Sequence, residues 1–139
     1  MSVVEVLAGI CRDARPPLHD ATTGSYQHAG HVARVIDGDT VDVVLHASVA
    51  RVGVVVWEER LRLAYIDTPE LRSGTQVQRA EGRAARDRTL ELAPAGAECV
   101  VHLHDVDSFG RGIASLVVAG TDIGEALLRE CHATPYRKK

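Results

Sequence analysis

The chain has 139 residues, of which 45% are hydrophobic and 25% are charged, and its formal net charge is −3. A chain of this length and apolar content forms one globular domain, so a two-domain protein and a disordered chain are both excluded. The acidic balance and the 4% aromatic content argue against a protein that binds polyanions by broad charge neutralisation or by a base-stacking platform.

The first 30 residues differ in pattern from the rest. Apolar residues recur at helical spacing between Val3 and Ile10, and two prolines follow at positions 16 and 17, which predicts an amphipathic helix from Val3 to Asp13. Residues 14–30 are rich in Pro, Thr, Gly and Ser and predict a linker. We therefore expect an N-terminal helix and linker over residues 1–30 and a folded domain over residues 31–139.

Targeting signals are not evident in the sequence. No Lys or Arg precedes the first apolar run, no run is long enough to span a bilayer, and the three cysteines have no paired spacing. We expect a cytoplasmic protein that does not associate with membranes.

Strand patterns dominate the middle of the chain, and the period changes near residue 76. Strands are predicted over residues 31–45 with a hairpin turn at Asp37-Gly38, and over Val49–Val56, Glu58–Ile66, Glu98–Asp105 and Gly112–Val118. Helices are predicted over Gln76–Leu92 and Asp122–Cys131. The apolar face of the first of these helices is predicted to consist of Val77, Ala80, Ala84, Thr89 and Leu92.

Two acidic stretches are candidate metal sites, although each has an ordinary structural interpretation. Asp37-Gly38-Asp39-Thr40 alone is typical of a hairpin turn, and an EF-hand is excluded because Val41 and Ser48 occupy ligand positions. Asp67-Thr68-Pro69-Glu70 is equally compatible with a helix start. His102 and His104 share a strand face, but without a third ligand they favour a solvated face over a zinc site.

Taken in order, three stretches and a following helix resemble the staphylococcal nuclease, or thermonuclease, family. The matching stretches are Val35–Val41 (VIDGDTV), Arg62–Glu70 (RLAYIDTPE) and Asp107–Gly112 (DSFGRG), followed by Glu125–Arg129 (EALLR). The resemblance runs from about residue 32 to the C-terminus. Three motifs in the right order, with a helix between the second and third, are specific to this family.

The resemblance implies an α+β, mainly β fold: a five-stranded OB-type barrel with two or three packed helices. It implies a calcium-dependent phosphodiesterase that cuts DNA and/or RNA at the P–O5′ bond and leaves 3′-phosphate ends. Asp39 and Asp67 are similar to the Ca²⁺ carboxylates of the family, with the Thr68 backbone carbonyl as a further ligand.

The remaining positions of the motifs match the residues that act on the substrate in this family. Glu70 is similar to the general base on the attacking water, and Arg62 and Arg111 are similar to the pair that holds the scissile phosphate. A nuclease-like module that has lost activity and binds nucleic acid or protein is the alternative, although these positions all keep competent residues. The sequence leaves a monomer and a homodimer both open.

Two features depart from the family pattern. Phe109 occupies a position where the family commonly has tyrosine, so a hydroxyl that could contact a phosphate is missing. The acidic balance predicts weaker binding of long polyanions unless a basic stripe forms in three dimensions. We also expect the amphipathic segment from Val3 to Asp13 to cover apolar surface of the barrel.

Overall fold

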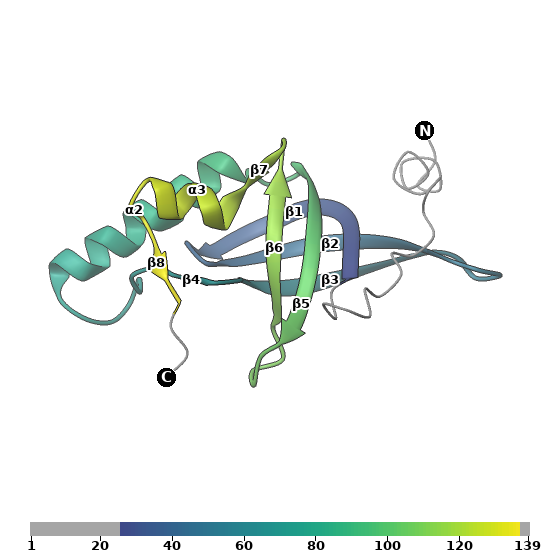
Figure 1. The fold of residues 1–139 in the computed structure, drawn as a ribbon, viewed down its shortest axis with the longest axis horizontal. Helices are drawn as coiled ribbons and strands as arrows, with labels where there is room; N and C mark the ends of the chain where they lie inside the picture. Colours follow the sequence, from purple (N-terminus) through teal and green to yellow (C-terminus); the bar gives the residue numbers. More distant parts are fainter. Residues whose placement is uncertain (1–25, 137–139) are drawn as a thin grey trace.

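Five strands of the computed structural model, which describes residues 26–136, close into a barrel (Figure 1). The barrel strands are β1 (Tyr26–Asp37), β2 (Thr40–Val49), β3 (Gly53–Leu63), β5 (Glu98–Val106) and β6 (Gly112–Val118). Neighbours in the order β3-β2-β1-β5-β6 pair antiparallel, and a parallel pairing of β3 with β6 at Leu61–Leu63 closes the barrel. The predicted α+β, mainly β architecture with an OB-type barrel is confirmed.

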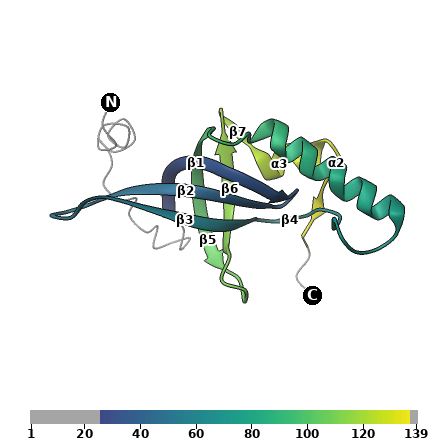
Figure 2. The ribbon, with the colours of Figure 1, turned by 180° about the vertical axis from the view of Figure 1, so that it is seen from behind.

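Two helices and three short strands complete the described part of the chain. These elements are β4 (Ile66–Asp67), α2 (Gln76–Leu92), β7 (Thr121–Asp122), α3 (Ile123–Arg129) and β8 (Thr134–Pro135). Both helices lie at the same end of the barrel, where α2 packs against β1 and α3 (Figure 2). The predicted bounds of α2 are confirmed, and Asp122 caps α3 by accepting a hydrogen bond from the backbone of Glu125.

The core fills the barrel and continues under α3. Side chains of β6 alternate between buried and partly exposed positions, as expected for a strand with one face inward, and β2 alternates in the same way after its first four residues, which are all buried. The largest fully buried side chains are Val32, Val41, Val43, Leu45, Leu61, Leu63, Ile66, Val101, Leu116, Ile123 and Leu127. Burial of this apolar surface is the main force that holds the barrel together.

Several strand boundaries differ from the sequence prediction: β2 continues to Val49, and the predicted strands Val49–Val56 and Glu58–Ile66 are largely one strand, β3. β1 begins at Tyr26, so residues 26–30 belong to the barrel and not to the linker. Residues 50–52 form a turn within the predicted strand Val49–Val56, with Arg51 at a φ of 67°. Tyr65, also at a φ of 67°, separates β3 from β4 within the predicted strand Glu58–Ile66. Both turns lie at non-glycine residues in the left-handed region, where sequence gives little warning.

The buried face of α2 is only partly the predicted one: Thr89 is buried and Leu92 packs against the core, but Ala80 and Ala84 are exposed. Gly82, Ala85 and Thr89 are buried, whereas Val77 is 67% exposed. The Thr89 hydroxyl donates a hydrogen bond to the carbonyl of Gly38 at 2.8 Å, which ties α2 to the β1–β2 turn. Gly82 lies so close to the Pro69 and Glu70 carbonyls that a side chain there would meet them at under 3 Å. The close approach of Gly82 to the loop after β4, more than the spacing of apolar residues, determines which side of α2 is buried.

Two expectations concern other parts of the chain. The predicted helix Val3–Asp13, and any cover it gives the barrel, lie outside the described residues. Neither α2 nor α3, the helices described between residues 26 and 136, has the length and hydropathy needed to cross a bilayer.

Candidate active site

Strand register brings the predicted site residues to one end of the barrel. Arg62 on β3 lies opposite Thr40 of β2 on one side and opposite Ile113 of β6 on the other. Asp39 precedes Thr40, and Arg111 lies two residues before Ile113, so both reach the same end of the barrel as Arg62. The remaining predicted site residues lie in β4 and in the loop after it: Asp67, Thr68 and Glu70. One cavity of about 550 Å³ is lined by Asp39, Arg62, Asp67, Thr68, Glu70 and Arg111, together with Asp37 and Arg72.

Arg62 bridges the two candidate metal carboxylates. Its Nη1 lies 2.9 Å from Oδ2 of Asp39, and its Nη2 donates a hydrogen bond to Oδ1 of Asp67 at 2.5 Å. The Thr68 backbone N–H donates to Oδ2 of Asp39 at 3.2 Å, so the β1–β2 turn and the loop after β4 meet at this carboxylate. The Arg62 side chain is only 16% exposed, so water screens its attraction to the two carboxylates only weakly.

Arg111 is held by a residue that the sequence interpretation did not single out. Asp107 accepts hydrogen bonds from the backbone N–H groups of Phe109 and Arg111, and its Oδ2 lies 2.7 Å from Nε of Arg111. Burial raises the pKa of Asp107, but these hydrogen bonds outweigh burial and hold the pKa below its ordinary value. Asp107 therefore fixes both the turn and the direction of the guanidinium. Its place at the start of the third motif was the available signal.

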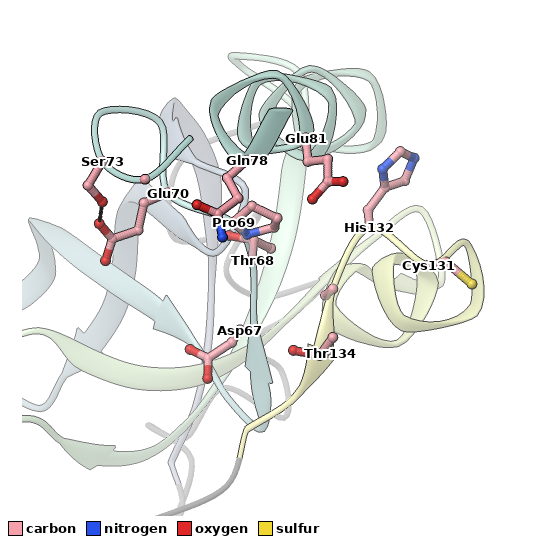
Figure 3. A pocket seen from close by; sticks show the side chains of 12 residues that line it. Asp67, Thr68, Pro69, Glu70, Ser73, Gln78, Glu81, Cys131, His132 and Thr134 are labelled. Atoms are coloured by element: carbon pink, nitrogen blue, oxygen red, sulfur yellow. Dashed lines mark hydrogen bonds between the residues drawn. The ribbon is translucent and has the colours of Figure 1, made fainter. Parts of the chain in front are cut away.

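Glu70 lies on an exposed loop that separates two cavities. Its carboxylate accepts a hydrogen bond from the Ser73 hydroxyl, and Figure 3 shows this pair beside Thr68 and Pro69. A second cavity of about 470 Å³ lies against the same loop and is lined by α2 and by residues 131–134. The helix-start interpretation of Asp67–Glu70 is wrong, because α2 begins at Gln76 with Thr75 and Gln78 as its capping box.

Asp37 is the carboxylate that sequence reasoning treated only as a turn residue. Burial raises its pKa, the charges of Asp39 and Glu70 raise it further, and the charges of Arg72 and Arg86 oppose that rise. Asp39 and Glu70 therefore both act electrostatically on Asp37. The Asp-Gly-Asp spacing across a two-residue turn was the signal that could have identified it.

The oxygen donors of this cluster fit a hard divalent cation such as calcium. Asp39 and Asp67 provide carboxylates, both of them held by Arg62, and the repulsion that Asp39 and Glu70 exert on Asp37 would be relieved by positive charge. The Thr68 backbone contacts Asp39 through its N–H group, which is not a metal ligand. Between residues 26 and 136, no group of three or more His, Cys, Asp or Glu side chains has the spacing of a metal centre. A cation held here would therefore take main-chain and water oxygens as well as the two carboxylates.

Of the two histidines considered for zinc, His104 has other partners. Nε2 of His104 lies 3.0 Å from the Ser115 hydroxyl, and the centroid of its ring lies 5.7 Å from that of Tyr65. Burial and the neighbouring His102 lower the pKa of His104. Both histidines are partly exposed.

Comparison with known proteins adds two matches. Residues 60–139 match the family model described as "Staphylococcal nuclease homologue". The chain is also 35% identical over 117 residues to a protein named "Micrococcal nuclease" from Shigella flexneri, an alignment that covers 78% of this chain and 58% of that protein. The chain thus spans less than two thirds of the length of this relative.

Proposed function

Because the chain belongs to the staphylococcal nuclease homologue family, we propose that it is a calcium-dependent phosphodiesterase that hydrolyses DNA or RNA. We propose further that it cuts the P–O5′ bond and leaves 3′-phosphate ends. The observation that carries this proposal is the cavity where two guanidiniums, Arg62 and Arg111, meet the carboxylates of Asp39, Asp67 and Glu70. A binding module has no need for this acidic cluster, which repels phosphate unless a cation lies between them.

Arg62 and Arg111 would bind the scissile phosphate. Attack of water on a phosphodiester builds negative charge on the phosphoryl oxygens, so fixed guanidiniums stabilise the transition state more than the ground state. Both arginines are already oriented by carboxylates, Arg62 by Asp39 and Asp67 and Arg111 by Asp107. Such preorganisation lowers the cost of reorganisation during the reaction.

Glu70 would take the proton from the attacking water. It lines the cavity that contains both arginines, and Ser73 holds one of its oxygens through a hydrogen bond. A general base must lie within hydrogen-bond reach of the proton that it removes, so the loop from Asp67 to Gly74 sets its position. A bound calcium ion would supply further positive charge to the phosphoryl oxygens and orient the water.

Digestion of DNA tests the proposal. Single-stranded and duplex DNA would be incubated with Ca²⁺, with Mg²⁺ or with chelator, and wild type compared with Glu70→Gln, Arg111→Ala and the control Arg51→Gln in the β2–β3 turn. We expect cleavage by wild type and Arg51→Gln with Ca²⁺, and a loss of on the order of a hundredfold in kcat for Arg111→Ala, about 3 kcal/mol. The products should accept polymerase extension only after phosphatase treatment.

Two outcomes would contradict the proposal. Equal residual cleavage by wild type, Glu70→Gln and Arg111→Ala would assign the activity to another site or to a contaminant. Binding of DNA without cleavage under any cation condition would instead favour the inactive binding module.

A further inference from the structure

The arginines of the described part divide into two groups by their ion pairs. Five of them lie within salt-bridge distance of a carboxylate: Arg34, Arg60, Arg62, Arg88 and Arg111. Six have no carboxylate at that distance among residues 26–136: Arg51, Arg72, Arg79, Arg83, Arg86 and Arg129. Four members of the second group, Arg72 to Arg86, fall in one short segment beside the candidate active site. Although the chain is acidic, the described arginines that lack a salt bridge are therefore concentrated in one segment.

Three of these four arginines share one flank of α2. Arg79, Arg83 and Arg86 follow the i, i+4, i+7 spacing that places side chains on the same side of a helix. The opposite flank carries Arg88, whose guanidinium lies 2.6 Å from Glu130 just after α3. The arginine flank, defined here as Arg72, Arg79, Arg83 and Arg86, therefore includes the side of α2 that turns away from α3.

The arginine flank is continuous with the candidate active site. Arg72 lines the same cavity as Arg62 and Arg111. Arg86 is close enough to act electrostatically on Asp37, which lines that cavity too, and its buried Nε has no hydrogen-bond acceptor among the described residues. From Arg79 to Arg86 the flank extends along about 10 Å of helix, at 1.5 Å per residue. It thus forms a positively charged path that begins at the cavity rim.

We propose that the arginine flank binds the phosphate groups of a nucleic-acid strand next to the scissile phosphate and guides that strand along α2. The inference rests on the proposed function, because the strand is placed by the phosphate held at Arg62 and Arg111. A polyanionic backbone is the occupant that complements four guanidiniums with no carboxylate within salt-bridge distance among residues 26–136. With a net charge of −3, the molecule as a whole repels this strand, so attraction must come from a local surface.

Binding of an oligonucleotide tests the surface independently of cleavage. The full chain would be titrated, in chelator, into a fluorescein-labelled 20-nucleotide polythymidine strand at several salt concentrations. The double variant Arg79→Gln/Arg83→Gln would be compared with Arg51→Gln/Arg129→Gln, which removes the same charge from arginines that also lack ion pairs. Thermal unfolding of both variants would verify that they fold.

The flank variant should lose affinity and the control should not. Loss of two phosphate contacts should reduce the slope of log K against log salt by about 1.4, at ~0.7 per contact on a single strand. The Kd should rise roughly two- to fivefold per arginine removed, as for exposed ion pairs. Arg79→Lys/Arg83→Lys should restore most of the affinity because it keeps the charge. Equal losses in the flank and control variants, or no binding by wild type, would overturn the inference.

Cleavage with Ca²⁺ separates this inference from the proposed function. The flank variant should show a raised KM for the 20-nucleotide strand and unchanged kcat/KM for a dithymidine monophosphate, whose single phosphate would lie at Arg62 and Arg111 and leave none for the flank. If wild type cleaves neither substrate but the flank variant still binds the strand more weakly than the control, the proposed function fails and the flank stands. If wild type cleaves and the flank variant has an unchanged KM for the long strand, the flank inference fails alone.

Discussion

Asp37 and Asp42 lie five residues apart on the β1–β2 hairpin, and their surroundings move their pKa values in opposite directions. Asp42 is almost fully buried and is held by Arg34 and Arg60, its cross-strand partners on β1 and β3. The hydrogen bonds from Arg60 are the largest cause of its lowered pKa, although burial opposes them. Asp37 has no such ion pair among residues 26–136, and burial beside other carboxylates raises its pKa. The charge of Asp42 therefore stabilises the fold, and the charge of Asp37 destabilises it.

Asp42→Asn should destabilise the protein at neutral pH. A lowered pKa in the folded state gives stability that is complete above the ordinary value of 3.8 and is lost as pH falls through the folded pKa. We expect a loss of about 1–3 kcal/mol at pH 7, the range for hydrogen bonds to charged groups. Urea unfolding of wild type and variant at pH 7, and again well below pH 3.8, would measure the difference in their free energies of unfolding. A difference that persists in acid would mean that packing and not charge is responsible.

Asp37→Asn should stabilise the protein at neutral pH. A raised pKa means that the charged carboxylate is unfavourable in the folded state, a cost that is complete above the folded pKa and absent below the ordinary value of 3.8. In chelator, the variant should therefore melt at a higher temperature than wild type at pH 7, and the gain should disappear as pH falls to 3.8. Thermal unfolding followed by circular dichroism over this pH range would test it, and a gain independent of pH would exclude the electrostatic explanation.

Sequence motifs identified individual site residues better than they identified their supports. Asp39, Arg62, Asp67, Thr68, Glu70 and Arg111 were all chosen from motifs, and the structure brings them to one cavity. Ser73 and Asp107 were not chosen, because their importance comes from hydrogen bonds to Glu70 and Arg111 that exist only after folding. The roles of the chosen residues remain to be tested by the variants described above.

Element boundaries followed from sequence where a conventional signal exists and failed where it does not. The bounds of α2 were predicted correctly, since Thr75 precedes the helix and Pro94 follows it. The turn at Tyr65 was missed because it carries no glycine, proline or asparagine, and the turn at Arg51 was missed although Gly53, at a φ of 100°, follows it. The face of α2 was predicted only in part, since Gly82 and not an apolar side chain makes the closest approach to the loop after β4.

Gly82→Ala tests how α2 supports that loop. Alanine is the better helix former by about 1 kcal/mol, so an exposed position would gain stability. At Gly82 the new Cβ would lie 2.7 Å from the Glu70 carbonyl and 2.8 Å from the Pro69 carbonyl, both of them backbone atoms. Overpacking of about 1–3 kcal/mol should outweigh the gain and displace Glu70. We expect lower stability in urea and a reduced kcat.

Ala84→Gly is the control for that experiment, because Ala84 is exposed on the same helix. It should lose about 1 kcal/mol of stability through helix propensity alone and keep the wild-type kcat below its melting temperature. A stabilised and fully active Gly82→Ala protein would show that the loop moves away without consequence for Glu70.

At the scale of the whole molecule, composition concealed the arrangement of charge. The net charge of −3 suggested weak binding of polyanions, yet four acidic side chains line the cavity and four arginines without a salt bridge to the described residues form the arginine flank. The barrel itself followed from the resemblance of ordered motifs, whereas the parallel pairing of β3 with β6, which places Arg62 opposite Ile113 and near Arg111, required the structure. The spatial arrangement of its charged side chains, and not the net charge alone, determines which ligands this molecule attracts.

Calcium should stabilise the entire fold if the carboxylates bind it. A ligand that binds only the folded state adds about 2.7 kcal/mol when present at a hundred times its Kd, and this corresponds to a rise in Tm of roughly 5–15 °C for a domain of this size. Asp39→Asn/Asp67→Asn should abolish the rise, and Asp87→Asn, an exposed residue on α2, should retain it. Differential scanning calorimetry with and without Ca²⁺ measures this without reference to cleavage. The same rise in the double variant would place calcium at other carboxylates and remove the cation from the cavity beside Arg62.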